Sequence, residues 1–226
     1  MNRLLYLHLH KPPVLEVKYF EHFTPTEISQ INTALFYAYT SHFGQMRQNG
    51  TPYIDHPIRM MKIAMDRLGI YDTNLIITLI LHDVDEDSHF LLSNVIIGVW
   101  FGLKQKHNIT MLTKTKENKE TYLLDIMLCE IWEIILSKLI DRTDNMETLD
   151  GLDSKFQQKQ LDETVKYFFG LCNTLNEIIP KEFADIPDMI YKNLLCLCEK
   201  YVNDETDENT RKTLLLLNKQ RKIQSP

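Results

Sequence analysis

The chain has 226 residues, of which 44% are hydrophobic and 25% charged, and its formal net charge is -6. This length accommodates one well-buried core or at most two small domains, and the composition is globular rather than disordered or fibrous. The acidic balance argues against a general nucleic-acid coat, which needs Lys and Arg concentrated over a whole face. Any phosphate group that the protein handles must therefore be met by a few local basic residues.

The N-terminal stretch MNRLLYLHLH begins like a signal peptide, but its apolar part is short, carries two histidines and lacks a small-residue cleavage site. No segment reaches the roughly 18 uninterrupted apolar residues of a membrane span. The cysteines lie in apolar helical stretches without the CxxC spacing of a zinc site, and we expect reduced core thiols at Cys129, Cys172, Cys196 and Cys198. These features predict a cytoplasmic protein with neither a membrane nor a nucleic acid as its partner.

Helical periodicity begins at Thr24. The run Thr24-Pro-Thr-Glu27 is a capping box with proline at the first helical position, and it predicts a helix that ends near Gly44. Its apolar residues recur at spacings of three and four: Ile28, Ile31, Leu35, Tyr39 and Phe43. Turn-forming residues follow at 48–53, and a second helix is expected from Pro57 to about Leu68, closed by Gly69.

A third helix is expected from Asp72 into the acidic segment LHDVDEDS at 81–88. A fourth is expected at 88–107, where a strand is the alternative because aliphatic and aromatic residues crowd 96–101. After a charged loop at 113–120, the apolar pattern of 123–149 predicts two helices. Further helices are expected at 154–178, 182–201 and 207–221. There is no repeat and no hairpin signal, so the predicted fold class is all-α.

The segment LHDVDEDS ends an apolar run in a histidine and four carboxylates. Burying an unpaired carboxylate is unfavourable, so a bound cation is expected. The imidazole of His82 and the carboxylate of Asp83 suit a first-row divalent metal better than Ca²⁺. If the helix continues, Glu86 and Asp87 lie one turn further on, where they could orient or deprotonate a water on the metal. The alternative is a solvated acidic helix end, which the helix dipole disfavours.

A second polar cluster follows the apolar helix expected at 131–140. Asp141 is reached directly from that helix and is a candidate metal ligand. Asp141 and Asn145 fall on one face, as do Asn145 and Thr148. The two neutral side chains suit a ribose or a base better than a metal. The alternative for Asp144 and Asn145 is a helix end or a turn.

Three segments together resemble a known family. They are HFGQMRQNGTPYIDHP at 42–57, LHDVDEDS at 81–88 and DRTDNMETL at 141–149. In this order, over about residues 26 to 170, they look like the hydrolase domain of RelA/SpoT homologues, HD-superfamily proteins whose stand-alone forms are called small alarmone hydrolases. The H-x-x-Q-x-R and G-x-P-Y-I-x-H-P pattern of the first segment is far more specific than the HD pair alone.

The resemblance implies an all-α HD-domain helical bundle with additional C-terminal helices. It implies an enzyme of the stringent response that uses Mn²⁺ to remove pyrophosphate from the 3′ position of ppGpp or pppGpp, leaving GDP or GTP. The implied metal ligands are His56, His82, Asp83 and Asp141. Two imidazoles and two carboxylates leave positions open for water and phosphate, as a catalytic metal site requires. Glu86 and Asp87 match the acidic pair that handles the nucleophilic water.

The resemblance also assigns the substrate side. Arg47 matches a basic residue near the phosphates and base, and Asn145 and Thr148 match residues that contact the nucleoside. Weaker candidates for offsetting the diphosphate charge are Lys138 and Arg142, and Arg142 could equally form a surface ion pair of little value. His42 matches a family position but is not expected to be a ligand.

Three departures from the family pattern are Gln48, where many relatives carry a basic residue, Asp85 and Asp144. Gln48 removes one positive charge from the substrate side, so base preference stays open. The alternatives are therefore a hydrolase of another nucleotide such as ppApp or pppApp, and a nucleotide-binding HD protein without catalysis.

The match divides the chain into an N-terminal extension at 1–23, a hydrolase domain at 24–178 and a C-terminal helical extension at 179–226. The synthetase and regulatory domains of long family members have no room in 226 residues, so a stand-alone type is expected. The C-terminal helices could pack on the domain, form a homo-oligomer face or bind a partner. Leu194, Leu195, Leu197 and the leucines at 214–217 are core or interface residues, with core the preferred interpretation.

Overall fold

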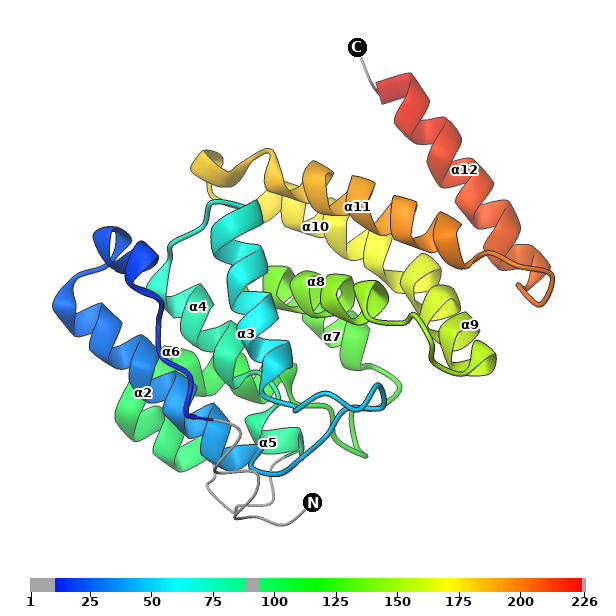
Figure 1. Ribbon diagram of the computed structural model, residues 1–226. Helices are drawn as coiled ribbons and strands as arrows, with labels where there is room; N and C mark the ends of the chain where they lie inside the picture. Colours follow the sequence, from blue (N-terminus) through cyan, green and yellow to red (C-terminus); the bar gives the residue numbers. More distant parts are fainter. Residues whose placement is uncertain (1–10, 88–93, 225–226) are drawn as a thin grey trace. The chain divides into compact units, whose positions relative to one another are not determined.

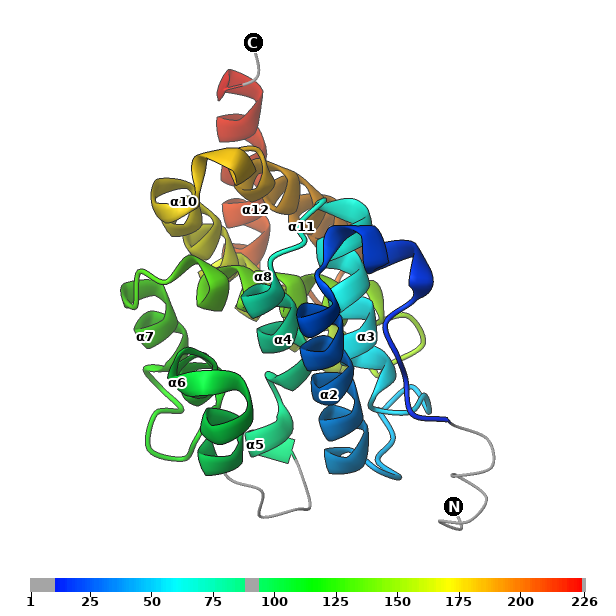
Figure 2. The ribbon, with the colours of Figure 1, turned by 90° about the vertical axis from the view of Figure 1, so that its left-hand side faces the viewer.

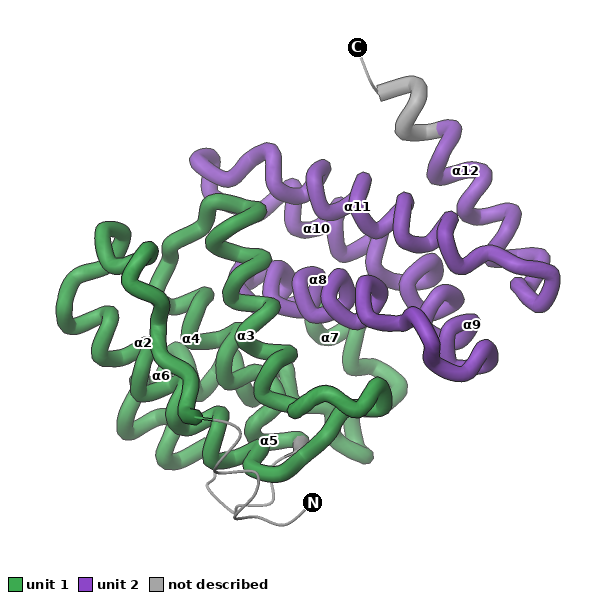
Figure 3. The backbone as a smooth tube through the Cα atoms, viewed as in Figure 1, with its two compact units in different colours: residues 1–126 green, residues 127–226 purple. Residues whose placement is uncertain are grey.

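The computed structural model describes residues 11–87 and 94–224, and this part of the chain is helical without a β-strand (Figure 1). An isolated antiparallel bridge joins Met46 and Pro52. The predicted all-α class is therefore confirmed. The chain forms two compact units, residues 1–126 and 127–226, shown in different colours in Figure 3.

The elements of the first unit follow one another along the chain, and the last of them, α7, extends two residues into the second unit. They are the 3₁₀ helix η1 (Val17–His22), α2 (Pro25–Ser41), α3 (Asp55–Lys62) with a π-helical turn η2 (Ile63–Arg67), α4 (Thr73–Leu81), α5 (Val84–Asp87), α6 (Asn94–Leu112) and α7 (Tyr122–Leu128). Gly69 closes the second predicted helix with φ +66°, a left-handed conformation that glycine adopts without strain.

Helix α4 is the buried centre of the first unit. Its last seven residues, Leu75 to Leu81, are all buried. Helices α2, α3 and α6 pack against it, and Figures 1 and 2 show α2 running beside it. A helix that is apolar on every face is stable only when it is covered on every side. Each of its large aliphatic side chains contributes about 1.5–3 kcal/mol on burial, so the position of the Leu81 end is strongly specified.

The predicted capping box begins α2 and also reaches α4. The Thr24 hydroxyl accepts from the Glu27 amide, and the Glu27 carboxylate accepts from the Thr24 amide at 2.8 Å. The other Glu27 oxygen accepts from the hydroxyl of Thr73, the first residue of α4, at 2.8 Å. These hydrogen bonds, first from Thr24 and then from Thr73, lower the pKa of Glu27.

Helix α6 differs from its predicted bounds. Residues 88–93, the start of the predicted helix, lie outside the described residues, and α6 runs from Asn94 to Leu112 with a kink at Gly102, where φ is +89°. The strand alternative at 96–101 is wrong. Ile97, Ile109 and Leu112 are buried, so packing of the helix, rather than local β propensity, decides this segment.

The second unit is built around α8. Its elements are α8 (Trp132–Glu147), α9 (Ser154–Glu163), a π-helical turn η3 (Thr164–Phe168), α10 (Phe169–Ile178), the 3₁₀ helix η4 (Lys181–Phe183), α11 (Ile186–Tyr201) and α12 (Glu208–Gln224). Helices α10 and α11 pack on α8. Helix α8 continues to Glu147, so Asp144 and Asn145 lie in its last turn, as the helix-end alternative expects.

The C-terminal leucines are core in part. Leu194, Leu195 and Leu214 are buried, as predicted, whereas Leu215 and Leu216 are 63% and 59% exposed. The core interpretation is wrong for these two residues: α12 packs against α11 and η3, and Leu215 and Leu216 are left exposed.

The four cysteines also divide into buried and more exposed residues, and none of them forms a disulfide. Cys172 and Cys198 are buried, and burial raises the pKa of Cys198 to about 12. Cys129 is half-buried and Cys196 is exposed, so the core prediction is wrong for Cys196. Within the described residues, no helix combines the length and the apolar character that a membrane crossing requires.

The Glu27 contacts predict a pH-dependent stability. A lowered pKa means that the ionised carboxylate stabilises the fold above the ordinary value of 4.5, and that this contribution is lost as the pH falls through the folded-state pKa. Glu27→Gln is expected to lower the free energy of unfolding by up to about 1 kcal/mol at pH 7, and this difference from the wild type should shrink as the pH falls below 4.5. Urea unfolding across this range measures the difference. A constant difference would contradict the assignment, and Glu177→Gln, at an exposed position in α10, is the control.

Candidate metal centre

Three predicted ligands converge in the first unit. His56 lies in the first turn of α3, and His82 and Asp83 directly follow α4. Each offers one ligand atom, and these atoms lie within 4.8 Å of one another. His56 and His82 are 2% and 3% exposed, while Asp83 is partly exposed. The cluster is therefore largely withdrawn from water but open on the carboxylate side.

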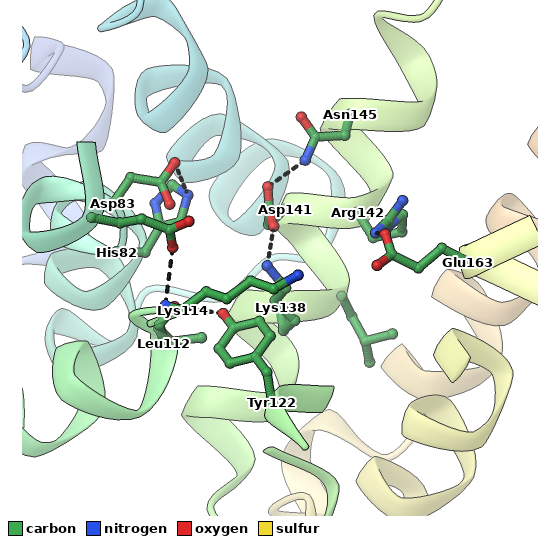
Figure 4. A network of polar contacts seen from close by, with 12 residues as sticks. His82, Asp83, Leu112, Lys114, Tyr122, Lys138, Asp141, Arg142, Asn145 and Glu163 are labelled. Atoms are coloured by element: carbon green, nitrogen blue, oxygen red, sulfur yellow. Dashed lines mark hydrogen bonds and ion pairs between the residues drawn. The ribbon is translucent and has the colours of Figure 1, made fainter. Parts of the chain in front are cut away.

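Both imidazoles face Asp83 with their Nε2 atom. The Nε2 atom of His82 lies 2.9 Å from Asp83 Oδ2, as Figure 4 shows, and Nε2 of His56 lies 3.8 Å from the same oxygen. Nδ1 of His82 lies 2.9 Å from the carbonyl oxygen of Leu79. A carbonyl oxygen only accepts, so Nδ1 carries the hydrogen and Nε2 keeps the lone pair that a metal needs. Two imidazoles and a carboxylate fit a divalent first-row metal.

Tyr53, His42 and Gln45 form a second set of contacts, which reaches the same oxygen of Asp83. The Tyr53 hydroxyl donates to Asp83 Oδ2 at 2.6 Å. The Tyr53 ring stacks on the His42 ring with centroids 4.4 Å apart, and His42 Nδ1 lies 2.8 Å from Gln45 Oε1. His42 therefore supports a ligand rather than acting as one. Sequence analysis assigned Tyr53 no role, although its place one turn before His56 in the G-x-P-Y-I-x-H-P pattern was an available signal.

The loop before Tyr53 carries Arg47 and Gln48. Its two edges are joined by the bond from the Arg47 amide to the Thr51 carbonyl, 2.8 Å, and by the bond from the Tyr53 amide to the Gln45 carbonyl, 3.0 Å. Arg47 is half-buried and Gln48 is exposed at the turn. Both predicted substrate residues thus lie in the same unit as the ligand cluster, on the loop that ends at Tyr53.

The acidic residues after Asp83 lie in different environments. The chain turns at His82 and Asp83 and resumes as the short helix α5. Glu86 is exposed and accepts a hydrogen bond from the backbone amide of Lys114 at 3.0 Å. Asp85 is half-buried, and burial raises its pKa. The side chain of Asp87, the other predicted catalytic acid, lies outside the described residues.

In the second unit, Asp141 joins two of the predicted substrate residues. Asp141 Oδ1 accepts from Asn145 Nδ2 at 2.6 Å, and Oδ2 accepts from Lys138 Nζ at 2.8 Å (Figure 4). The predicted shared face of Asp141 and Asn145 is therefore confirmed. The Thr148 hydroxyl donates to the Asp144 carbonyl at 2.9 Å and ends α8.

Arg142 points to the packing side of the second unit. Its guanidinium is bonded to Glu163 and Gln160 and lies 4.2 Å from the centre of the Phe168 ring. The Arg142 side chain is 7% exposed and the Glu163 side chain is 29% exposed, so the surface ion-pair alternative is wrong. Arg142 connects α8 to α9 and the π-helical turn η3, and we assign it a structural role.

Comparison with known proteins agrees with this geometry. No family model matches the chain. The chain is 30% identical over 162 residues to a GTP pyrophosphokinase of Myxococcus xanthus, covering 66% of this chain and 21% of that protein. It is 30% identical over 203 residues to a guanosine-3′,5′-bis(diphosphate) 3′-pyrophosphohydrolase of Aquifex aeolicus (strain VF5), covering 79% and 28%.

A solved structure shows the same fold. It belongs to a metazoan SpoT orthologue, described as hydrolysing ppGpp and playing a role in starvation responses. The two align with a TM-score of 0.58 at 22% identity, covering 73% of this chain and 94% of the other.

The helical fold and the His/Asp cluster define an HD-type protein. More narrowly, the chain is a homologue of the RelA/SpoT-type proteins, and the resemblance predicted from the three motifs is confirmed. It spans 20% to 28% of the length of the curated relatives it matches. The stand-alone type stays a prediction.

The Tyr53 contact predicts an effect on metal affinity. Tyr53→Phe removes the hydroxyl that donates to Asp83 and is expected to weaken the binding of a divalent metal by about tenfold, the usual effect of losing a hydrogen bond to a metal ligand. Isothermal titration calorimetry with Mn²⁺ measures it. Tyr71→Phe is the control, because Tyr71 stacks on His22 through its ring. Equal Mn²⁺ affinity in Tyr53→Phe and the wild type would contradict the role of Tyr53.

The buried Arg142 contacts predict an effect on stability. Arg142→Met leaves Glu163 without this cation and is expected to lower the free energy of unfolding by about 2–3 kcal/mol, less than for a fully buried pair because Glu163 is partly exposed. Urea unfolding measures the loss. In the control, Lys192→Met removes the exposed ion pair with Asp188 and should change stability by less than about 0.5 kcal/mol. A similarly small loss for Arg142→Met would contradict the structural role.

Proposed function

We propose that the protein is a metal-dependent 3′-pyrophosphohydrolase of ppGpp and pppGpp that acts in the stringent response. The observation that carries the proposal is the convergence of His56, His82 and Asp83, followed by Glu86, in a homologue of SpoT-type proteins. The Aquifex aeolicus relative bears the name of this activity, and the aligned metazoan orthologue is described as hydrolysing ppGpp. Substrate, product and metal identity all belong to the proposal.

We propose Mn²⁺ as the metal. The donor set of two imidazole nitrogens and one carboxylate fits it, and the hard phosphate oxygens of the substrate suit the same ion. When bound, such a cation would act as a Lewis acid. It would make water a better nucleophile at neutral pH and would offset the charge of the phosphates. The fourth predicted ligand, Asp141, belongs to the second unit and remains an assignment by family resemblance.

Side chains of the protein would then transfer the proton of the attacking water. The water oxygen forms a bond to the proximal phosphorus of the 3′-diphosphate, and the bond between that phosphorus and the 3′ oxygen breaks. Glu86 accepts the proton of the water, and the same proton is available to the departing 3′ oxygen, so that water and ppGpp yield GDP and pyrophosphate. Asp87 is the second acid of the proposal, in line with the family pattern.

We propose that Arg47 binds the phosphates of the substrate and that Gln48, the next residue, also contacts the substrate. Lys138, Asn145 and Thr148 are kept as candidate contacts to the nucleotide. Lys138 and Asn145 hold Asp141 in the structure, so either could act on substrate through that carboxylate. Base preference depends on these polar groups and is left to measurement.

The hydrolase domain is proposed to span residues 24–178, with extensions at 1–23 and 179–226. We place the protein in the cytoplasm, in keeping with its thiols, which form no disulfide in the described residues. The exposed Leu215 and Leu216 of α12 are consistent with a homo-oligomer or partner contact through the C-terminal helices.

The test is product analysis by anion exchange after incubation with ppGpp or ppApp, each with Mn²⁺ and with EDTA. GDP and pyrophosphate are the expected products, and EDTA should abolish their release. Glu86→Gln and Asp83→Asn are expected to lower turnover by about 10²- to 10⁴-fold. Glu208→Gln is the matched control, since Glu208 forms an exposed ion pair with Lys212.

Three outcomes would change the proposal. Wild-type turnover in Glu86→Gln and Asp83→Asn would show that this cluster is not the active centre. Faster turnover of ppApp would replace the guanine nucleotide by its adenine analogue. Tight nucleotide binding without turnover in Mn²⁺ would favour a nucleotide-binding protein that does not catalyse.

A further inference from the structure

The segment that holds Glu86 is closed by hydrogen bonds of its own. Residues 113–121 connect α6 to α7, and sequence analysis assigned most of them to a solvated, charged loop. In the structure the Asn118 side chain accepts from the Thr115 amide at 2.7 Å and donates to the Thr113 carbonyl at 3.3 Å. The amide of Tyr122, the first residue of α7, donates to the Asn118 carbonyl at 2.7 Å. The loop is therefore an ordered turn rather than a free connection.

Tyr122 joins the two ends of this loop. Its hydroxyl donates to the carbonyl oxygen of Leu112, the last residue of α6, and Figure 4 shows its side chain beside Leu112 and Lys114. The Tyr122 residue is 4% exposed, and the Lys114 ammonium lies 5.6 Å from the centre of its ring. Leu112 is followed by Thr113 and then by Lys114, whose amide donates to Glu86. The Tyr122 hydroxyl thus fixes the backbone two residues before the amide that holds the carboxylate.

Helix α6, which leads into the loop, is also fixed on α4, the helix that precedes His82 and Asp83. Gln105 and Asn108 of α6 reach Thr78 of α4: Thr78 Oγ1 donates to Gln105 Oε1 at 2.8 Å, and Asn108 Nδ2 donates to Thr78 Oγ1 at 3.1 Å. Thr78 lies one turn before His82 on the same chain. These buried hydrogen bonds set the register of α6 on α4, because a one-residue shift would leave several polar groups unpaired in the core.

We propose that Tyr122 is a positioning residue: it holds the 113–121 loop closed so that the Lys114 amide fixes the Glu86 carboxylate for proton transfer. The inference rests on the function proposed above. Glu86 lies on a helix of four residues, and the Lys114 amide donates to its carboxylate at 3.0 Å, which restrains the position of that carboxylate. Small displacements of a catalytic group lower the rate of the chemical step more than they lower substrate binding.

The first test is kinetic. Tyr122→Phe keeps the buried ring and removes the hydroxyl, and it is expected to lower kcat for ppGpp about tenfold while KM and Mn²⁺ affinity change less than twofold. In the Glu86→Gln background the same substitution should have no further effect on the residual turnover, because Tyr122 acts through Glu86. Tyr167→Phe, in the second unit, is the control for losing a phenol hydroxyl elsewhere. An additive effect in the double variant, or an unchanged kcat in Tyr122→Phe, would overturn the proposal.

The second test needs no turnover. Amide hydrogen exchange at Lys114 and along residues 113–121 should be faster in Tyr122→Phe than in the wild type, and Asn118→Ala should accelerate it in the same way. Unchanged exchange in Tyr122→Phe would overturn the proposed hold on the loop. Absence of nucleotide turnover in the wild-type protein would instead overturn the proposed function, and exchange would still decide whether Tyr122 closes the loop.

Discussion

The burial of α4 is the constraint on which the candidate metal centre depends. The helix is apolar on all its faces and ends at Leu81, so the residues that follow emerge from the core at a well-defined place. Asp83 arrives there as a partly desolvated carboxylate, an unfavourable state unless donors or a cation compensate it. The Tyr53 hydroxyl donates to Oδ2, and the two histidine Nε2 atoms that face the same oxygen leave the remaining compensation to a cation. The same desolvation favours a divalent ion at this place.

The first unit supports the proposed metal ligands and the proposed base Glu86 at two levels. The ligands lie on α3 and at the end of α4, elements whose backbones are held by core packing, whereas Glu86 lies on a four-residue helix. A site built this way needs hydrogen bonds outside the ligand set to keep its geometry. On one side they come from Gln45, His42 and Tyr53. On the other side they come from the loop that Tyr122 closes.

Helix α8 shows how neighbouring residues take different roles. Asp141 bonds to Lys138 and Asn145, on the face defined by spacings of three and four, whereas the next residue, Arg142, reaches Gln160, Glu163 and Phe168. Successive side chains of a helix differ in direction by about 100°. A polar residue that is next to a candidate ligand in the sequence therefore need not belong to the same site. The polar character of the motif is the same in both cases, and the surroundings of each side chain determine its role.

The sequence by itself determined the all-α class, the capping box at Thr24 and the closing Gly69, which follow from the local rules of helical periodicity and cap chemistry. The family resemblance, and no local rule, assigned His56 to the same site as His82 and Asp83. Only the tertiary structure excluded the strand alternative at 96–101 and decided that Arg142 is buried, that Cys196 and Leu215 are exposed, and that the Tyr53 hydroxyl reaches Asp83 and the Tyr122 hydroxyl reaches Leu112. Each of these depends on which side chains from distant parts of the chain become neighbours, and the free energy of burial or of a long-range hydrogen bond is absent from any local pattern.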